Sequence, residues 1–201
     1  MNYSVKISIL LFVVSIITAC ATSVSTGEAE KTDGGQKNAS ASRIRLFGQN
    51  GVRIVFYRDS TCYEDGLFGI GDKGETVSGG MGQSFSSFIG IASNASIGMP
   101  ETTNTKNITK RDGTLSKAYF REYEIESEKP LTVLAAAGMP NWGCNRISAS
   151  FMPKPGKDYE VFLDVSFAEK VCRLQLKEIQ VNEGVVELKP IEGVRSALEC
   201  K

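Results

Sequence analysis

Residues 158–167 alternate between apolar and polar side chains, and this pattern constrains the fold more than any other. Every second residue from Tyr159 to Phe167 is apolar, whereas most residues between them are polar. Successive side chains of a β-strand point to opposite faces, so a period of two is typical of a strand with one buried face. We therefore expect a strand whose Tyr159 side faces a core and whose Glu160 and Asp164 side chains face solvent.

The same period predicts further strands in most of the chain after residue 43. Short segments with this pattern are separated by polar turns, and helical periodicity is weak. This succession predicts an all-β fold for residues 43–201, an antiparallel β-sandwich of about seven strands. The further segments are residues 43–47, 52–58, 119–125, 131–136, 145–151, 171–181 and 185–189.

Turn residues indicate how the first two strands pair. Asn50-Gly51 lies between residues 43–47 and 52–58. Asn-Gly favours the type I′ turn of a two-residue hairpin, because both central residues of that turn need a positive φ. We expect a hairpin in which Leu46 lies opposite Val55.

The strands after residue 158 are predicted to form a meander. A loop at residues 168–171 would place Val165 opposite Leu174 and Leu163 opposite Leu176. Along residues 171–181 the apolar side chains first occupy even-numbered positions and then, from Ile179, odd-numbered ones. This change predicts a β-bulge near Lys177 and Glu178. A turn at Glu183-Gly184 leads to the last strand.

Residues 60–117 show little strand pattern. Nearly sixty residues without secondary structure are improbable inside one domain. Phe85, Phe88, Ile89 and Ala92 have helical spacing, so we expect a short helix there. The remainder, rich in Gly, Ser, Thr and Asn, is predicted to be an extended insertion.

The start of the chain looks like an export signal. Residues 1–6 carry Lys6, and about a dozen mostly apolar residues follow, fewer than the roughly 20 that a membrane-spanning helix needs. This run ends in Ile17-Thr18-Ala19-Cys20, which resembles the lipobox of bacterial lipoproteins. The resemblance implies that residues 1–19 are a signal peptide and that Cys20 carries lipid. The alternative is an ordinary secretory leader, because Ala19-Cys20-Ala21 also fits a small-x-small cleavage site.

The residues after Cys20 predict location and attachment. Lipoproteins of this kind tend to carry aspartate there when they stay in the inner membrane, and this chain has Ala21 and Thr22. The resemblance therefore implies the outer membrane, with the domain in the periplasm. Residues 20–42 are rich in small polar residues and lack aromatic ones, so they cannot bury enough surface to fold. We interpret them as a flexible tether between lipid and domain.

Four cysteines follow Cys20 in the chain, and an even number in an exported domain predicts two disulfides that staple the sandwich. Three pairings are possible. If residues 145–151 and 171–181 lie two strands apart in a meander, their cysteines are about 9–10 Å apart, beyond the usual limit of about 7 Å between bridged Cα atoms. This favours Cys62–Cys144 and Cys172–Cys200. A zinc site needs C-x₂₋₄-C spacing or histidine, and the chain has neither, so we expect no metal.

The second half of the chain has a loose resemblance to a known architecture. The segments FREYEIESEKPLTV, at residues 120–133, and FMPKPGKDYEVFL, at residues 151–163, alternate with cysteines before and within strands. This arrangement resembles the prealbumin-type or immunoglobulin-like sandwiches of small bacterial lipoproteins. It covers roughly a third of the chain and implies a fold more than a function.

Composition argues against nucleic-acid binding and against histidine-dependent catalysis. The chain has 23 basic and 23 acidic residues, no basic stripe and no histidine. Residues 69–74 match G-x-G-x-x-G, but no buried strand precedes them and no helix follows, so we expect no nucleotide cofactor. Ser116-Lys117 lacks the spacing of Ser–Lys hydrolases.

Two further features have a structural and a functional interpretation. Glu122, Glu124 and Glu126 lie at alternate positions and would therefore share one face of a strand. Such a row of acids allows carboxylate-pair catalysis but is more typical of a solvated edge. Trp142, two residues before Cys144, is either a binding aromatic or a side chain that packs over a disulfide or the core edge. We favour the structural interpretation for both.

These observations favour a non-catalytic outer-membrane lipoprotein that is held through lipid on Cys20. Its partner would be an envelope protein or a cell-wall component. An inhibitor or immunity-type lipoprotein that plugs an active site with residues 66–100 is the alternative. An enzyme acting on glycan would need a cleft with two carboxylates about 5–10 Å apart.

Overall fold

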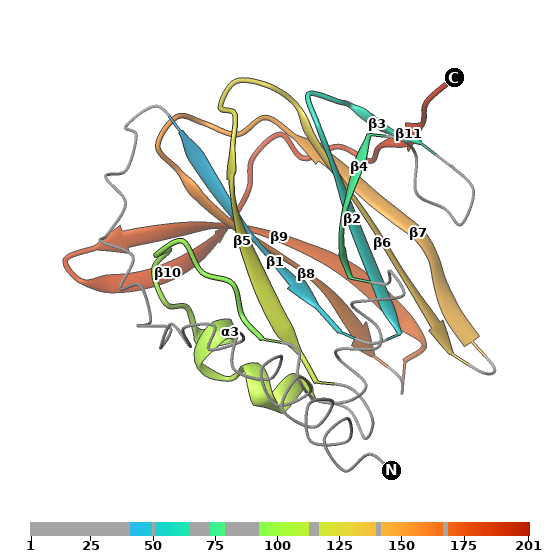
Figure 1. The fold of residues 1–201 in the computed structure, drawn as a ribbon, viewed down its shortest axis with the longest axis horizontal. Coiled ribbons are helices and arrows are strands. Elements are labelled where there is room, and N and C mark those ends of the chain that lie inside the picture. Colours follow the sequence, from blue (N-terminus) through green and yellow to red (C-terminus); the bar gives the residue numbers. More distant parts are fainter. Residues whose placement is uncertain are drawn as a thin grey trace, which may run out of the picture. The chain divides into compact units, whose positions relative to one another are not determined.

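The structure is a computed structural model that describes residues 41–49, 51–64, 73–78, 93–112, 117–139, 142–166 and 169–201. Within these residues two β-sheets pack against each other as a sandwich, so the predicted fold class is confirmed (Figure 1). The described residues form eleven strands rather than about seven. None of their helices is long and apolar enough to cross a membrane.

The first sheet has five strands in the order β10-β9-β8-β1-β5. β1 pairs with β5 in antiparallel fashion and with β8 in parallel, so the sheet is mixed rather than wholly antiparallel. The strands are β1 (Ser42–Gly48), β5 (Tyr119–Ile125), β8 (Asp158–Ser166), β9 (Val171–Asn182) and β10 (Val185–Pro190).

The second sheet has four antiparallel strands in the order β4-β2-β6-β7. They are β2 (Val52–Arg58), β4 (Gly74–Ser78), β6 (Leu131–Met139) and β7 (Trp142–Phe151). A separate two-residue parallel ribbon joins β3 (Cys62–Tyr63) to β11 (Leu198–Glu199), near the C-terminus (Figure 1). The segment between β4 and β5 carries a helical turn, α3 (Thr103–Lys106), and a 3₁₀ turn, Ile108–Arg111.

The core lies between the inner faces of the two sheets. Ile44 of β1 and Ile54 and Phe56 of β2 are fully buried in it. The predicted inward side of β8 is confirmed, because Tyr159 and Val161 belong to the same core and the Tyr159 ring packs 5.0 Å from that of Phe151. Phe167 and the helix predicted near residues 85–92 lie outside the described residues.

The hairpin predicted at Asn50-Gly51 is wrong. Gly51 has a φ of +78° and the Val52 N–H donates to the Gln49 carbonyl, but the two strands that follow from this turn enter different sheets. Both are interior strands that are buried over most of their length. Both edges of each strand are paired with strands from other parts of the chain, so neither strand has an edge left to pair with the other.

The β8–β9 pairing keeps the predicted faces but is shifted by two residues. Val165 lies opposite Cys172 and Leu163 opposite Leu174. The pairing runs without interruption as far as Ile179, so the predicted bulge is wrong. Ile179 lies opposite Asp158 and is buried, whereas Val181, the next apolar residue of the same parity, is 53% exposed, so the change of parity marks no bulge. The predicted turn at Glu183-Gly184 is confirmed.

Candidate functional site

The four cysteines after Cys20 form two disulfides, but not the favoured pairs. The structure joins Cys62 to Cys200, with Cα atoms 5.1 Å apart, and Cys144 to Cys172, with Cα atoms 6.0 Å apart. The favoured pairing was wrong because it placed β7 and β9 in one meander. These strands belong to opposite sheets, so Cys144 and Cys172 meet across the sandwich interior. Cys20 lies outside the described residues.

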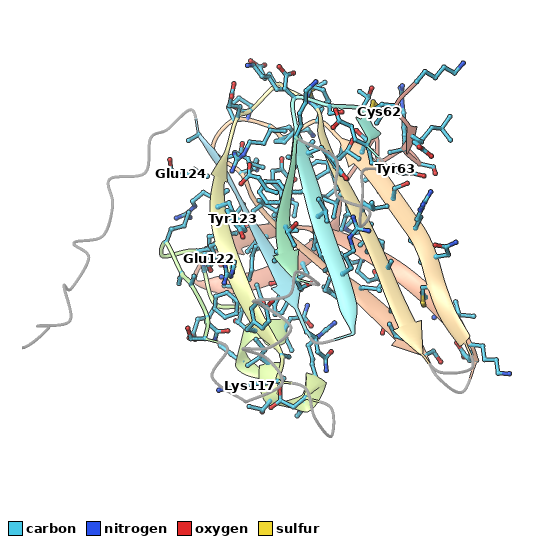
Figure 2. All side chains as sticks on the ribbon, turned by 45° about the vertical axis from the view of Figure 1, so that its right-hand side comes forward. Cys62, Tyr63, Lys117, Glu122, Tyr123 and Glu124 are labelled. Atoms are coloured by element: carbon cyan, nitrogen blue, oxygen red, sulfur yellow. A yellow bond between two sulfur atoms is a disulfide. The ribbon has the colours of Figure 1, made fainter. Side chains whose placement is uncertain are left out.

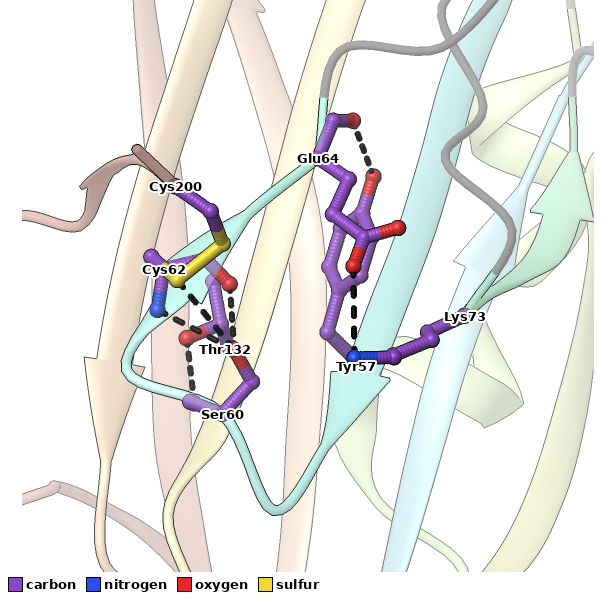
Figure 3. Close-up of a disulfide and its surroundings, with 7 residues drawn as sticks. All are labelled: Tyr57, Ser60, Cys62, Glu64, Lys73, Thr132 and Cys200. Carbon is purple, nitrogen blue, oxygen red and sulfur yellow. Dashed lines mark hydrogen bonds and ion pairs between the residues drawn. A yellow bond between two sulfur atoms is a disulfide. The ribbon is translucent and has the colours of Figure 1, made fainter.

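The Cys62–Cys200 disulfide fastens the C-terminal segment to one end of the second sheet (Figure 3). Ser60 Oγ donates to the Cys62 carbonyl at 2.7 Å, and Thr132 Oγ1 of β6 donates to the Ser60 carbonyl at 2.7 Å. Beyond β3, Tyr57 Oη of β2 donates to the Glu64 carbonyl at 3.1 Å. The disulfide is therefore attached to β2 and β6 through hydrogen bonds on both sides of Cys62.

A cleft of about 580 Å³ lies beside this disulfide. Its walls include Pro130, Phe151, Met152 and Leu198, and its rim carries Arg195. Ligand sites in proteins are mostly apolar hollows of about 300–1,000 Å³ with a few polar groups, and this cleft has both properties.

One wall of the cleft is the segment of residues 193–199. Arg195 and Ser150 of β7 exchange two backbone hydrogen bonds of 2.8 and 2.9 Å. Ser148 Oγ donates to the Ala197 carbonyl at 2.7 Å, and Leu198 then pairs with Cys62. The wall is thus held along its length by β7 and at its end by the disulfide, which fixes the shape of the cleft before any ligand enters.

Arg195 gives the cleft its charge. It is the one charged residue among the described residues that line the cleft. Its guanidinium has no hydrogen bond or ion pair within the described part of the chain. Glu192 and Glu199, the acids closest to it in sequence, pair instead with Lys154 at 3.5 Å and Arg146 at 3.8 Å. The rim therefore offers an uncompensated positive charge.

A buried cluster of charges lies on the outer face of the first sheet. Arg45 of β1 donates to Glu122 Oε1 of β5 at 2.9 and 2.6 Å and to Glu160 Oε2 of β8 at 3.1 Å. All three side chains are at most 1% exposed. Beside them Arg43 makes a two-point ion pair with Asp158, and this hydrogen bonding raises the pKa of Arg43.

The carboxylates of Glu122 and Glu160 hold residues 96–104 against the outer face of the first sheet through hydrogen bonds. Glu122 Oε2 accepts from the Ser96 hydroxyl and from the backbone N–H groups of Ile97 and Met99, at 2.7 to 3.2 Å. Glu160 accepts from Thr102 Oγ1 at 2.7 Å and from Asn104 Nδ2 at 2.6 Å. Every carboxylate oxygen in this pair thus has at least one donor.

The prediction that Glu160 and Glu122 face solvent is wrong. The period of two identified the correct sheet face, but it carried no information about the segment that covers that face. Glu124 is exposed (Figure 2). Glu126 lies beyond the end of β5, where a hydrogen bond from Lys129 lowers its pKa. Neither Glu122 nor Glu160 lines the cleft beside the disulfide.

The remaining candidate residues contribute little to a site. Gly74 begins β4, and a Cβ there would lie 2.7 Å from Val55 Cγ1, so this glycine permits close packing. Residues 69–72, Ser116 and the Trp142 side chain lie outside the described residues, as does much of the loop of residues 66–100. Of its described parts, residues 74–78 form β4, and residues 96–99 are hydrogen-bonded to Glu122. Within the described residues no group of His, Cys, Asp and Glu side chains is arranged to hold a metal ion.

The cleft and the charge cluster were not found from the sequence. Arg45 stands between Ile44 and Leu46 in an apolar strand, and a charge in such a place signals a buried partner. Its partners, however, lie 77 and 115 residues away.

No protein-family model matches the chain, and no curated protein shows significant similarity to it.

Proposed function

We propose that this chain is a non-catalytic outer-membrane lipoprotein that is anchored through lipid on Cys20 and binds an envelope component in the periplasm. The observation that carries this proposal is the pairing of the cysteines. Cys62 with Cys200 and Cys144 with Cys172 account for every cysteine after Cys20. Structural disulfides persist in oxidising compartments, and Cys20 is left free for modification.

The cleft beside the Cys62–Cys200 disulfide supports a binding role. A site whose walls are held in place before binding loses less conformational freedom when a ligand enters, so more of the contact energy appears as affinity. The backbone pairing of Arg195 with Ser150 and the disulfide provide this restraint.

The buried carboxylates support a role without catalysis. A general acid or base must reach the proton that it transfers. Glu122 and Glu160 are instead saturated by donors and covered by residues 96–104. Their arrangement is that of a structural fastening.

The anchor is tested by the mass of the full-length protein purified from cells and by its distribution between membrane and soluble fractions. We expect a lipidated amino terminus at Cys20, and we expect Cys20→Ala to move the protein to the soluble fraction. Two acyl chains hold a protein stably on a membrane, whereas the variant without Cys20 would have no acyl chain to hold it there. Thr22→Ala is the matched control and should stay with the outer membrane. Membrane retention of Cys20→Ala, or an unmodified Cys20 in the native protein, would contradict the proposal.

A further inference from the structure

Exposed apolar side chains form part of the cleft. Six large apolar side chains are exposed among the described residues, and two of them, Met152 and Leu198, line the cleft. Leu198 is 77% exposed and Met152 is 53% exposed, and both line the cleft. Apolar side chains that cluster on a surface mark binding sites, since leaving them in water is unfavourable. Met152 also has a flexible thioether side chain that adapts to different apolar ligands.

A single cation stands at the rim of this apolar hollow. The guanidinium of Arg195 has five N–H donors in a planar arrangement that matches the two oxygens of a carboxylate. No described acidic side chain lines the cleft to occupy it. An apolar interior with one free cation complements a ligand that has one negative head and an apolar body.

A second cleft, which shares Met152 with the first, differs in that its cations have acidic partners. It has a volume of about 410 Å³ and is lined by Lys154, Lys157 and Lys189. Each of these lysines already has an acidic partner within 4 Å, namely Glu192, Glu178 and Glu187. Among the described residues that line these two clefts, Arg195 is therefore the cation without an acidic partner.

Resting on the proposed binding role, we propose that the cleft beside the Cys62–Cys200 disulfide binds an aliphatic carboxylate. Its carboxylate lies against the Arg195 guanidinium, and its chain lies along Leu198, Met152 and Phe151. The binding step forms no covalent bond. Specificity comes from the charge of the head, and affinity comes mainly from the apolar surface that the chain covers.

The test is calorimetric titration of the full chain, as purified from cells and held in lipid nanodiscs, with the heats of empty nanodiscs subtracted. The probes are octanoate, octanol and octyltrimethylammonium, which share a chain and differ in the charge of the head. We expect octanoate to bind about two- to fivefold more tightly than octanol, which is within the range that exposed ion pairs give. Octyltrimethylammonium should bind more weakly than either.

Three variants separate charge from apolar contact. Arg195→Gln should abolish the preference for octanoate over octanol and leave octanol binding unchanged. Leu198→Ser should weaken both ligands by about threefold or more, because it removes apolar contact. Arg173→Gln removes an exposed arginine that does not line the cleft and should change nothing.

Equal binding of the three probes, no binding of octanoate, or an unchanged preference in Arg195→Gln would overturn the inference. The mass of the amino terminus is read separately on the same preparation. A lipidated protein that does not bind octanoate therefore overturns the ligand assignment alone. An octanoate-binding protein with an unmodified Cys20 overturns the anchor alone.

Discussion

Replacing Arg45 by methionine should strongly destabilise the domain. The side chain donates to Glu122, to Glu160 and to the carbonyls of Met99 and Pro100. Methionine keeps part of the volume but removes the cation that contacts both carboxylates. Breaking a buried ion pair by removing one partner typically costs about 3–5 kcal/mol, because the remaining charge is uncompensated.

This loss is a large part of the stability of an ordinary domain, which is about 5–15 kcal/mol. For a domain of this size, about 1 kcal/mol corresponds to a change of about 2–4 °C in Tm, so Arg45→Met should lower Tm by about 6–20 °C. Circular dichroism of the full chain measures this transition. Hydrogen exchange should also show lost protection at the backbone N–H groups of Ile97 and Met99, since both donate to Glu122.

Two comparisons isolate the charge. Arg173→Met removes an exposed arginine paired with Glu169 and should cost at most about 1 kcal/mol. Adding Glu122→Gln and Glu160→Gln to Arg45→Met removes the uncompensated charges and should recover part of the lost stability. The reasoning is refuted if Arg45→Met stays within about 1 kcal/mol of the wild type, or if the triple variant is less stable than Arg45→Met alone.

Two further predictions concern the disulfides and pH. The disulfides close loops of 138 and 28 residues, so chain entropy predicts contributions of about 5 kcal/mol for Cys62–Cys200 and about 3.6 kcal/mol for Cys144–Cys172. Denaturant titration of the two double serine variants should preserve this order, and the reverse order would contradict it. Burial raises the pKa of Tyr159 above its ordinary value of 10.0, so the unfolded chain releases that proton first. The associated stability is fully present below pH 10 and is lost as the pH rises through the folded pKa. Tm measured against alkaline pH should fall less steeply in Tyr159→Phe, and identical slopes would argue against this cause.

The sequence predicted the strands better than it predicted their partners. The segment 119–125 coincides with β5, and the inward side of β8 is as expected, because a period of two reports directly on which side chains are buried. The hairpin at Asn50-Gly51 and the favoured disulfides failed for one common reason. Both assumed that strands adjacent in sequence pair within one sheet, whereas in this sandwich the chain passes between sheets after β1 and after β7.

The charge cluster and the cleft were beyond sequence reasoning for a related reason. A period of two shows which face of a strand is apolar, but a charged outer face looks the same whether water or a covering segment lies over it. Glu160 illustrates this, since it has the pattern of a solvated residue and is fully buried. The cleft likewise combines residues from around positions 62, 130, 151 and 195, which no local pattern connects.

The Cys62–Cys200 disulfide links the proposed location to the proposed binding site. The parallel pairing of β3 with β11 covers two residues on each side, and a ribbon of this size is not stable by itself in water. The wall that carries Arg195 and Leu198 therefore depends on the disulfide to keep its far end in place. In a reducing compartment this end would lose its covalent link to β3, and Leu198 would be held by its short pairing with β3 and by the hydrogen bond from Ser148 to its neighbour Ala197. If the chain is exported as proposed, the oxidising conditions outside the cytoplasm would keep this disulfide formed.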